Sequence, residues 1–188
     1  MPAPRPLDVV AVFDDMLEAA HSGAAWAQEA LYRSLAGQVC GYLRLHGALE
    51  PDDLTNEVFL RVFSKLDGFE GDESQFRSWV FTITHRLLID DRRRRDCRPR
   101  LADASAYDSI VGGDVERDAL RRIEQNSVEA TLVALPPDQR DVLMLRVLGG
   151  LTVEEVARAL DKRPGAVKAL QRRGVARLKR HLEQGMAS

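Results

Sequence analysis

The sequence predicts an all-α protein, with two small helical domains joined by a flexible linker. Apolar residues recur at helical spacing over most of the chain, and no stretch shows the apolar–polar alternation of a half-buried strand. Residues 96–118 have no apolar period and contain Pro99 and Gly112-Gly113, which is typical of a linker. A chain of 188 residues, 45% of them hydrophobic, can hold two small domains. We therefore expect domains over residues 1–95 and 119–188.

The first domain is predicted to contain four helices after a proline-rich start. We expect them over residues 8–22, 25–46, 51–66 and 75–95. In the third helix, Leu54, Val58 and Val62 form one apolar stripe. In the fourth, Trp79 and Leu87 are expected to be partly buried, since aromatic residues at helical spacing usually are.

The fourth helix is an aromatic and apolar stretch that runs directly into the four arginines Arg92–Arg95. Positive charge attracts phosphate regardless of base sequence. Aromatic faces such as those of Phe76 and Trp79 give an unpaired base a surface on which to stack. The helix is therefore suited to single-stranded or opened nucleic acid. The alternative is an amphipathic core helix with a solvated charged end.

The second domain is also predicted to consist of helices. We expect them over residues 115–133, 137–148, 152–160 and 164–183. Pro136-Pro137 separates the first pair, and Gly149-Gly150 ends the next helix. Thr152 and Glu155 have the spacing of a capping box at the start of the third.

The last two helices have the pattern of a helix-turn-helix, with Asp161-Lys162-Arg163 as the turn and Pro164 at a first helical position. From Lys162 to His181 there are eight Lys or Arg residues and no acid. A basic second helix is the geometry that enters the major groove, although αα-hairpins in general share the pattern. The buried stripe of this helix is expected to be Val167, Leu170, Gly174, Leu178 and Leu182.

Short segments of both domains occur in the order and spacing of a known family. In the first domain they are Gly23, Ala27, Leu31-Tyr32-Arg33, Tyr42-Leu43-Arg44, 53–61, Leu66-Asp67-Gly68-Phe69, Phe76-Arg77-Ser78-Trp79 and Ile89-Asp90. In the second they are Leu135-Pro136, Gln139-Arg140, Val142-Leu143, Leu145-Arg146, Gly150-Leu151-Thr152, 154–157, Gly165 and Val167-Lys168. On these residues the chain resembles the extracytoplasmic-function (ECF) sigma factors, the small two-domain initiation factors of bacterial RNA polymerase.

The resemblance implies that the third helix docks on the clamp helices of the largest polymerase subunit. The sequence agrees, because residues 50–75 hold eight acids against Arg61 and Lys65, and an acidic face suits a protein partner better than DNA. The alternative is a solvated acidic face. The residues implied in polymerase binding are Asp52, Asp53, Asn56, Glu57, Phe59, Leu60 and Arg61. The second domain is expected to meet the flap tip.

The resemblance also implies that the loop from Phe69 to Gln75 receives a flipped promoter base, whose unstacking cost a pocket must recover. Ser74 is expected to cap the next helix as well. Arg86 stands where many family members have Asn, and Arg prefers guanine edges or phosphate. The residues implied in minus-ten DNA binding are Asp72, Ser74, Phe76, Arg77, Trp79, His85, Arg86, Arg92, Arg93, Arg94 and Arg95.

For the minus-thirty-five element, the resemblance implies that the last helix reads double-stranded DNA. Arg172 and Arg173 are expected to select bases, while Lys162, Arg163 and Arg177 anchor phosphates. The segment 169–174 departs from the usual family sequence, which predicts a different minus-thirty-five preference. The residues implied are Lys162, Arg163, Lys168, Gln171, Arg172, Arg173 and Arg177.

Several other classes of function find no support in the sequence. Cys40 and Cys97 have neither metal-ligand spacing nor a disulfide framework, and no nucleophile–base pair or phosphate loop occurs. Cys40 is expected to be buried. Cys97, beside arginines, is either reactive or simply a small residue in the linker. We expect no enzyme, no metal and no cofactor.

The net charge of −2 averages over an uneven distribution, which indicates separate surfaces for separate partners. No stretch is long enough to span a bilayer and no secretory signal is evident, so a cytoplasmic location without membrane contact is expected. The resemblance implies an anti-sigma factor as a further partner. Two rival interpretations are a stand-alone helix-turn-helix regulator and an all-helical adaptor that uses the acidic face.

Overall fold

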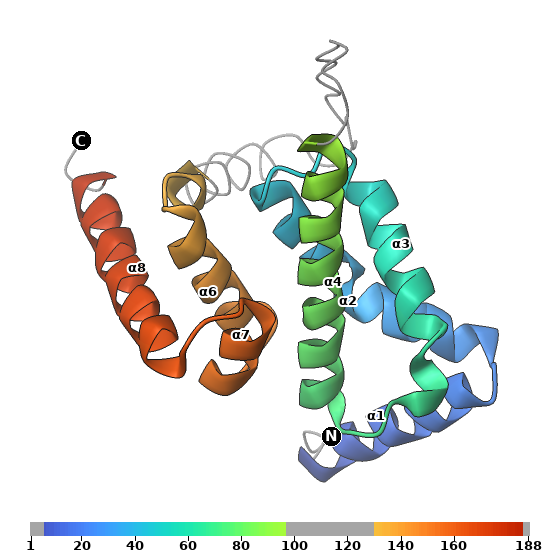
Figure 1. The fold of residues 1–188 in the computed structure, drawn as a ribbon. Coiled ribbons are helices and arrows are strands. Elements are labelled where there is room, and N and C mark those ends of the chain that lie inside the picture. Colours follow the sequence, from blue (N-terminus) through green and yellow to red (C-terminus); the bar gives the residue numbers. More distant parts are fainter. Residues whose placement is uncertain (1–5, 97–129, 186–188) are drawn as a thin grey trace, which may run out of the picture.

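The computed structural model describes residues 6–96 and 130–185, here called the N-terminal half and the C-terminal half. Helices are the only regular elements within these two ranges, which confirms the all-α fold class (Figure 1). The N-terminal half contains α1 (Pro6–His21), α2 (Ala25–Leu45), α3 (Pro51–Phe63), the short 3-10 helix η1 (Leu66–Gly68) and α4 (Glu73–Asp96). The C-terminal half contains α6 (Pro137–Val147), α7 (Val153–Ala159) and α8 (Pro164–Gly185).

These bounds agree with the predicted helices to within three residues. The third helix ends at Phe63 rather than at residue 66, because the chain continues into the 3-10 turn. The fourth begins two residues early, at Glu73. The predicted helix over 115–133 lies outside the described residues except for 130–133, which are helical. The predicted linker lies outside them too, apart from Asp96 at the end of α4.

The N-terminal half is built around α2, which packs against α1, α3 and α4. Its largest fully buried side chains include Tyr42, Phe59 and Phe81, one from each of α2, α3 and α4. α2 ends in a Schellman motif, in which Ala48 N–H donates to Leu43 O at 3.0 Å and Gly47 takes a φ of 74°. Glycine adopts this left-handed conformation without steric cost.

In the C-terminal half, α8 packs against both α6 and α7. Val142, Leu145 and Val167 are fully buried there. Gly174 marks the close approach of α8 to α6, because a Cβ at this position would lie 2.7 Å from Leu143 Cδ1. Gly174 and the fully buried Val167 thus lie on the predicted stripe of the last helix.

The two halves share one buried apolar cluster rather than two separate ones. The turn between α6 and α7 lies against the middle of α4 (Figure 1). A Cβ on Gly149 would be 2.9 Å from Phe81 Cβ, and Gly149 O lies 3.3 Å from Ser78 Oγ, which donates to it. The face of α4 that meets this turn is the one that carries Ser78 and Phe81.

Candidate polymerase and nucleic-acid interfaces

The outer face of α3 carries the predicted acidic patch in an exposed position. Asp52, Asp53 and Asn56 are exposed, and Leu60 stands beside them with 71% of its surface accessible. Phe59 points the other way, into the core, where its ring meets that of Tyr32 edge-on at 4.7 Å. Of the two apolar candidates on this helix, the structure therefore leaves only Leu60 available to a partner.

Charged pairs hold this face in a defined arrangement. Glu57 accepts a hydrogen bond from Arg61 at 2.7 Å, one helical turn away, and its other oxygen lies 3.9 Å from Arg94 of α4. Beside this pair, α3 and the end of α4 enclose a groove of about 580 Å³. Both acidic and basic side chains line it: Glu50, Asp53, Glu57, Asp91, Arg94 and Arg95, together with Leu49 and Leu54.

On the opposite side of α3, Cys40 is half-buried rather than buried as predicted. Its thiol lies 3.3 Å from Asp52 Oδ1, and burial together with this carboxylate raises the pKa of Cys40. The other cysteine, Cys97, lies outside the described residues.

A capping box fixes the start of α4, and its cap is Asp72 rather than Ser74 as predicted. Gln75 N–H donates to Asp72 Oδ1 at 2.8 Å, and Asp72 N–H donates to Gln75 Oε1 at 2.9 Å. The spacing Asp-x-x-Gln in the sequence could have identified this cap. Ser74 is left exposed in the first turn of the helix, free of the capping role.

The aromatic residues of α4 divide between core and surface. Phe76 is fully buried and packs against Phe13 and Phe69, with ring centroids 5.9 and 5.4 Å apart. Trp79 is half-buried, as predicted, and stacks on Phe69 at 4.9 Å with an interplanar angle of 20°. Trp79 is thus the aromatic residue of this helix that retains an accessible edge.

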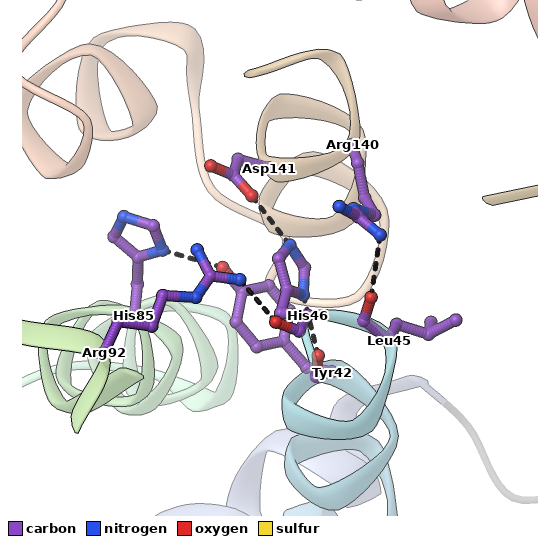
Figure 2. Close-up of polar contacts among 7 residues, drawn as sticks. All are labelled: Tyr42, Leu45, His46, His85, Arg92, Arg140 and Asp141. Atoms are coloured by element: carbon purple, nitrogen blue, oxygen red, sulfur yellow. Dashed lines mark hydrogen bonds and ion pairs between the residues drawn. The ribbon is translucent and has the colours of Figure 1, made fainter. Parts of the chain in front are cut away.

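His85 is buried as well, with 4% of its surface exposed. Its Nδ1 lies 2.8 Å from the hydroxyl of Tyr42 (Figure 2). The pKa of His85 is lowered to about 4, chiefly by burial; the charge of Asp141 opposes this shift, and the charges of His46 and Arg92 add to it. The neutral imidazole of His85 and the Tyr42 hydroxyl are hydrogen-bonded in the core, so this side chain stabilises the core and does not present a charge to DNA.

The arginines of α4 are held to different degrees. Arg86, Arg93 and Arg94 are exposed. Arg92 donates to His46 O at the end of α2, and Arg95 pairs with Asp91 at 2.8 Å. Near the start of the helix, Arg77 is half-buried and donates to Gln38 Oε1 at 2.7 Å.

In the C-terminal half, α7 and α8 form the predicted helix-turn-helix. The capping box of α7 is present, with Glu155 N–H donating to Thr152 Oγ1 at 3.2 Å. The turn passes through Asp161, whose φ of 51° places a non-glycine residue in the left-handed region. Lys162 N–H donates back to Ala157 O at 2.8 Å and closes the turn.

The predicted basic side chains cover one side of α8 and its entry. Arg163, Lys168, Arg172 and Arg173 are exposed. Gln171 and Arg177 are half-buried. Lys162 lies 3.0 Å from Asp138 Oδ2, so its charge is partly satisfied within the C-terminal half. Four cations thus face outward along the first turns of the helix.

Two kinds of feature do not occur among the residues that the structure describes. No group of three His, Cys, Asp or Glu side chains is arranged to hold a metal ion there. No helix within 6–96 or 130–185 is long and apolar enough to cross a membrane.

Comparisons with known proteins match both halves. The family described as "Sigma-70 region 2" matches residues 31–97, and "Sigma-70, region 4" matches residues 125–178. The ECF RNA polymerase sigma factor BldN of Streptomyces coelicolor is 32% identical over 174 residues, which cover 89% of this chain and 65% of BldN. SigX of Bacillus subtilis is 31% identical over 139 residues, 71% of each chain.

Solved structures agree on the fold. CnrH, in its complex with the cytosolic domain of CnrY, superposes with a TM-score of 0.58 at 23% identity, covering 90% of this chain and 96% of that one. RpoE of Bartonella quintana, in complex with the anti-sigma factor NepR, gives a TM-score of 0.59 at 19% identity, covering 82% and 96%.

A helical half with an acidic outer face, followed by a helix-turn-helix half, defines a bacterial transcription-initiation factor. The chain belongs to the ECF RNA polymerase sigma factor family. It is an alternative sigma factor that acts in transcription initiation and is not an enzyme. This membership decides against both a stand-alone regulator and an adaptor.

Proposed function

We propose that this sigma factor docks on core RNA polymerase through the outer face of α3 and contacts promoter DNA through α4 and α8. One observation carries the proposal: exposed charge is segregated by sign. Exposed acids lie on α3 (Asp52 and Asp53) and on α1 (Asp14, Asp15 and Glu18), whereas exposed arginines and lysines gather at the end of α4 and along α8. Charge complementarity steers a protein partner to the first surface and phosphate to the others.

On α3, Leu60 is the proposed apolar anchor of the polymerase contact. It is exposed and lies next to the Glu57–Arg61 ion pair on a helix whose other face is fixed by the core. An apolar centre with a charged rim is the usual anatomy of a protein interface. Phe59 supports this face from inside rather than touching the partner.

For the minus-ten element, we propose that residues 1–95 form the DNA-contacting domain and that the exposed side chains of α4 meet the opened strand. Asp72 and Ser74 lie at the start of the helix, beside Arg77, whereas the accessible part of Trp79 lies in the separate groove that also holds Arg86. Phosphate contacts are assigned to Arg86, Arg93 and Arg94, which are exposed. Phe76 and His85 contribute by holding the helix in place.

For the minus-thirty-five element, we propose that residues 119–188 form the second domain, with α8 in the major groove and a contact to the polymerase flap tip. Arg172 and Arg173 are exposed on the face opposite the buried Val167. Bidentate contacts from arginine to guanine are the commonest specific contacts in this groove. Arg163 and Lys168 are assigned to base edges or phosphates near the start of the helix.

We further propose that the protein acts in the cytoplasm, where its polymerase is found, and that an anti-sigma factor restrains it. The structural relatives CnrH and RpoE are each complexed with another protein, CnrY and the anti-sigma factor NepR respectively. Their similarity to this chain supports a partner of the same kind.

The polymerase assignment is tested by reversing charge on α3. Asp53→Arg combined with Glu57→Arg should abolish co-elution with bacterial core polymerase, because like charges across an interface cost several kcal/mol. Helical content measured by circular dichroism should stay at the wild-type value, since both side chains lie outside the core.

The matched control is Asp15→Arg with Glu18→Arg, two exposed acids of α1. It makes the same change in net charge on another helix and should retain co-elution and promoter-dependent transcription. Equal retention of core polymerase by both double variants would refute the α3 assignment.

A further inference from the structure

The two halves meet at a buried polar cluster that the sigma-factor assignment does not use. It consists of Tyr42, His46, His85 and Arg92 from the N-terminal half and Arg140 and Asp141 from the C-terminal half (Figure 2). Tyr42, His46 and His85 are at most 4% exposed, and Asp141 is 8% exposed. Buried polar side chains need partners, so this arrangement requires both halves to be in place.

His46 is the centre of the cluster. Its Nδ1 lies 2.7 Å from Tyr42 O, and its Nε2 lies 2.8 Å from Asp141 Oδ1. A carbonyl and a carboxylate can only accept, so an imidazole that carries a proton on both nitrogens suits both neighbours. The contact between His46 and Asp141 joins the two halves directly at this short distance.

The same place holds the carboxyl-terminal end of α2, whose last carbonyls have no partners inside the helix. Arg140 Nη1 donates to Leu45 O at 3.0 Å, and Arg92 donates to His46 O. Cations are favoured at this end of a helix dipole. One of these two caps comes from the C-terminal half, so separating the halves removes it.

The surroundings of Asp141 favour the charged form of its carboxyl group. Burial raises its pKa, but the hydrogen-bonding and charge effects of His46, together with His85 and Arg92, outweigh burial and leave the pKa below its usual value. The carboxylate is therefore held in its charged form by groups of the N-terminal half.

The contact between the two halves also determines what lies against α4. With the cluster formed, Gly149 sits against Ser78 and Phe81. Next to it, Trp79 and Arg86 line a groove of about 300 Å³ whose other wall is α7, with Glu155 and Arg158. While α7 forms the other wall, a DNA strand that meets Trp79 and Arg86 has to share this groove with Glu155 and Arg158.

We propose that Asp141 and Arg140 form an intramolecular latch, which holds the C-terminal half against α4 and keeps the free protein from binding opened DNA. The proposal rests on the proposed role of α4. It requires no partner chain, since every contact lies within the single chain. Contacts between halves of a chain resemble transient interfaces, so the latch can open when polymerase binds.

The test compares Asp141→Asn and Arg140→Gln with Asp138→Asn, a control on the same helix whose side chain is exposed and pairs within the C-terminal half. All are made in the full chain with Trp26→Phe, which leaves Trp79 as the single tryptophan; Trp26 is 62% exposed, so this change is mild. Acrylamide quenching then reports the exposure of Trp79, and small-angle scattering reports the radius of gyration.

We expect Asp141→Asn to shift the balance between closed and open forms by about tenfold, because it leaves His46 without its charged partner. Trp79 quenching and the radius of gyration should rise in Asp141→Asn and Arg140→Gln and stay at the starting value in Asp138→Asn. Binding of a fluorescein-labelled single-stranded DNA of mixed sequence should tighten by the same factor as the open fraction increases.

Circular dichroism confirms that each variant is folded. If both latch variants are folded and leave Trp79 quenching and the radius of gyration unchanged, the latch is refuted. If they open the protein without a gain in affinity for single-stranded DNA, the latch stands and the assignment of α4 to DNA is overturned.

Discussion

The two helices proposed to bind DNA differ in what else their basic side chains do. On α4, Arg77 donates to Gln38, and Arg92 donates to the carbonyl of His46. Along α8, by contrast, Arg172 and Arg173 are exposed and have no ion pair or side-chain hydrogen bond within the described residues. On α4, Arg77 and Arg92 therefore hold the N-terminal half together while Arg86 and Arg93 stay exposed, whereas Arg172 and Arg173 of α8 are both exposed.

This difference separates two kinds of experiment. A substitution on the outer face of α8 removes a DNA contact and leaves the fold unchanged. A substitution in the middle of α4 also changes packing or the contact between the halves. Loss of promoter activity therefore has a direct meaning for α8, and for α4 it has one only when stability is measured alongside.

The largest effect that follows from this comparison concerns His85 and pH. Because the pKa of His85 in the folded protein is lowered to about 4, the unfolded chain binds its proton first as pH falls from neutral. Stability is thus lost as the pH falls from the pKa of His85 in the unfolded chain, near 6.5, towards its pKa in the folded protein. Linkage gives a loss of about 2 kcal/mol on going from about pH 7.5 to about pH 5. Urea unfolding at the two pH values measures it.

The control is His85→Gln, which keeps an acceptor for the Tyr42 hydroxyl but does not titrate. In this variant the loss of stability over the same pH interval should shrink by about 2 kcal/mol. Asp141 also makes the protein less stable as the pH falls, but only below the ordinary pKa of an aspartate, because its own pKa is lowered in the folded protein. An identical pH dependence in the wild-type and His85→Gln proteins would contradict the burial of a neutral His85.

A second prediction contrasts Arg92 of α4 with Arg173 of α8. Arg92→Ala should lower the free energy of unfolding by about 2 kcal/mol, since it leaves a carbonyl at the end of α2 without its charged donor. Arg173→Ala should change it by no more than about 0.5 kcal/mol, because the side chain is exposed. Urea unfolding at neutral pH compares the two, and equal losses would show that the helices do not differ in this way.

The sequence predicted the helices better than it predicted their neighbours. Helical spacing and capping patterns are local, so the capping box of Thr152 and the burial of Val167, Leu170 and Gly174 are confirmed, while Leu178 is half-buried and the side chain of Leu182 lies outside the described residues. Spacing also identifies which residues share a face, but it does not show which other element covers that face. For this reason the burial of His85 and its contact with Tyr42 were not foreseen.

Local sequence patterns also do not predict the contact between the halves. His46 and Asp141 are separated by 95 residues, and nothing near either position in the sequence indicates the other. The cap of α4 is different, because the capping-box spacing of Asp72 and Gln75 is a local signal that identifies the cap, and the prediction of Ser74 is wrong.

A third prediction concerns base selection by α8. Arg172→Ala and Arg173→Ala should each flatten the preference at one or two positions of the minus-thirty-five element, with a loss of about 1 kcal/mol of discrimination, or somewhat more, for a bidentate contact. Arg163→Ala should weaken all promoters alike and give a shallower dependence on salt. Transcription across single-base promoter changes distinguishes them. An unaltered preference in both Arg172→Ala and Arg173→Ala would assign base selection to other residues.

The smallest expected effect concerns the turn that presents α8. The helices α1, α2 and α7 each end with a left-handed residue, which is Gly23, Gly47 and Asp161 respectively. A side chain at positive φ is strained, whereas glycine is not, but glycine also increases the entropy of the unfolded chain. Asp161→Gly should therefore raise the free energy of unfolding by only about 0.5 kcal/mol, and Gly47→Ala should lower it by about 1 kcal/mol.

The variant Asp161→Asn separates the effect of the backbone from that of the charge, because asparagine removes the carboxylate and keeps a side chain at that φ. A gain in urea unfolding with Gly but not with Asn would attribute the effect to backbone strain. An equal gain with both would attribute it to the charge of Asp161 instead.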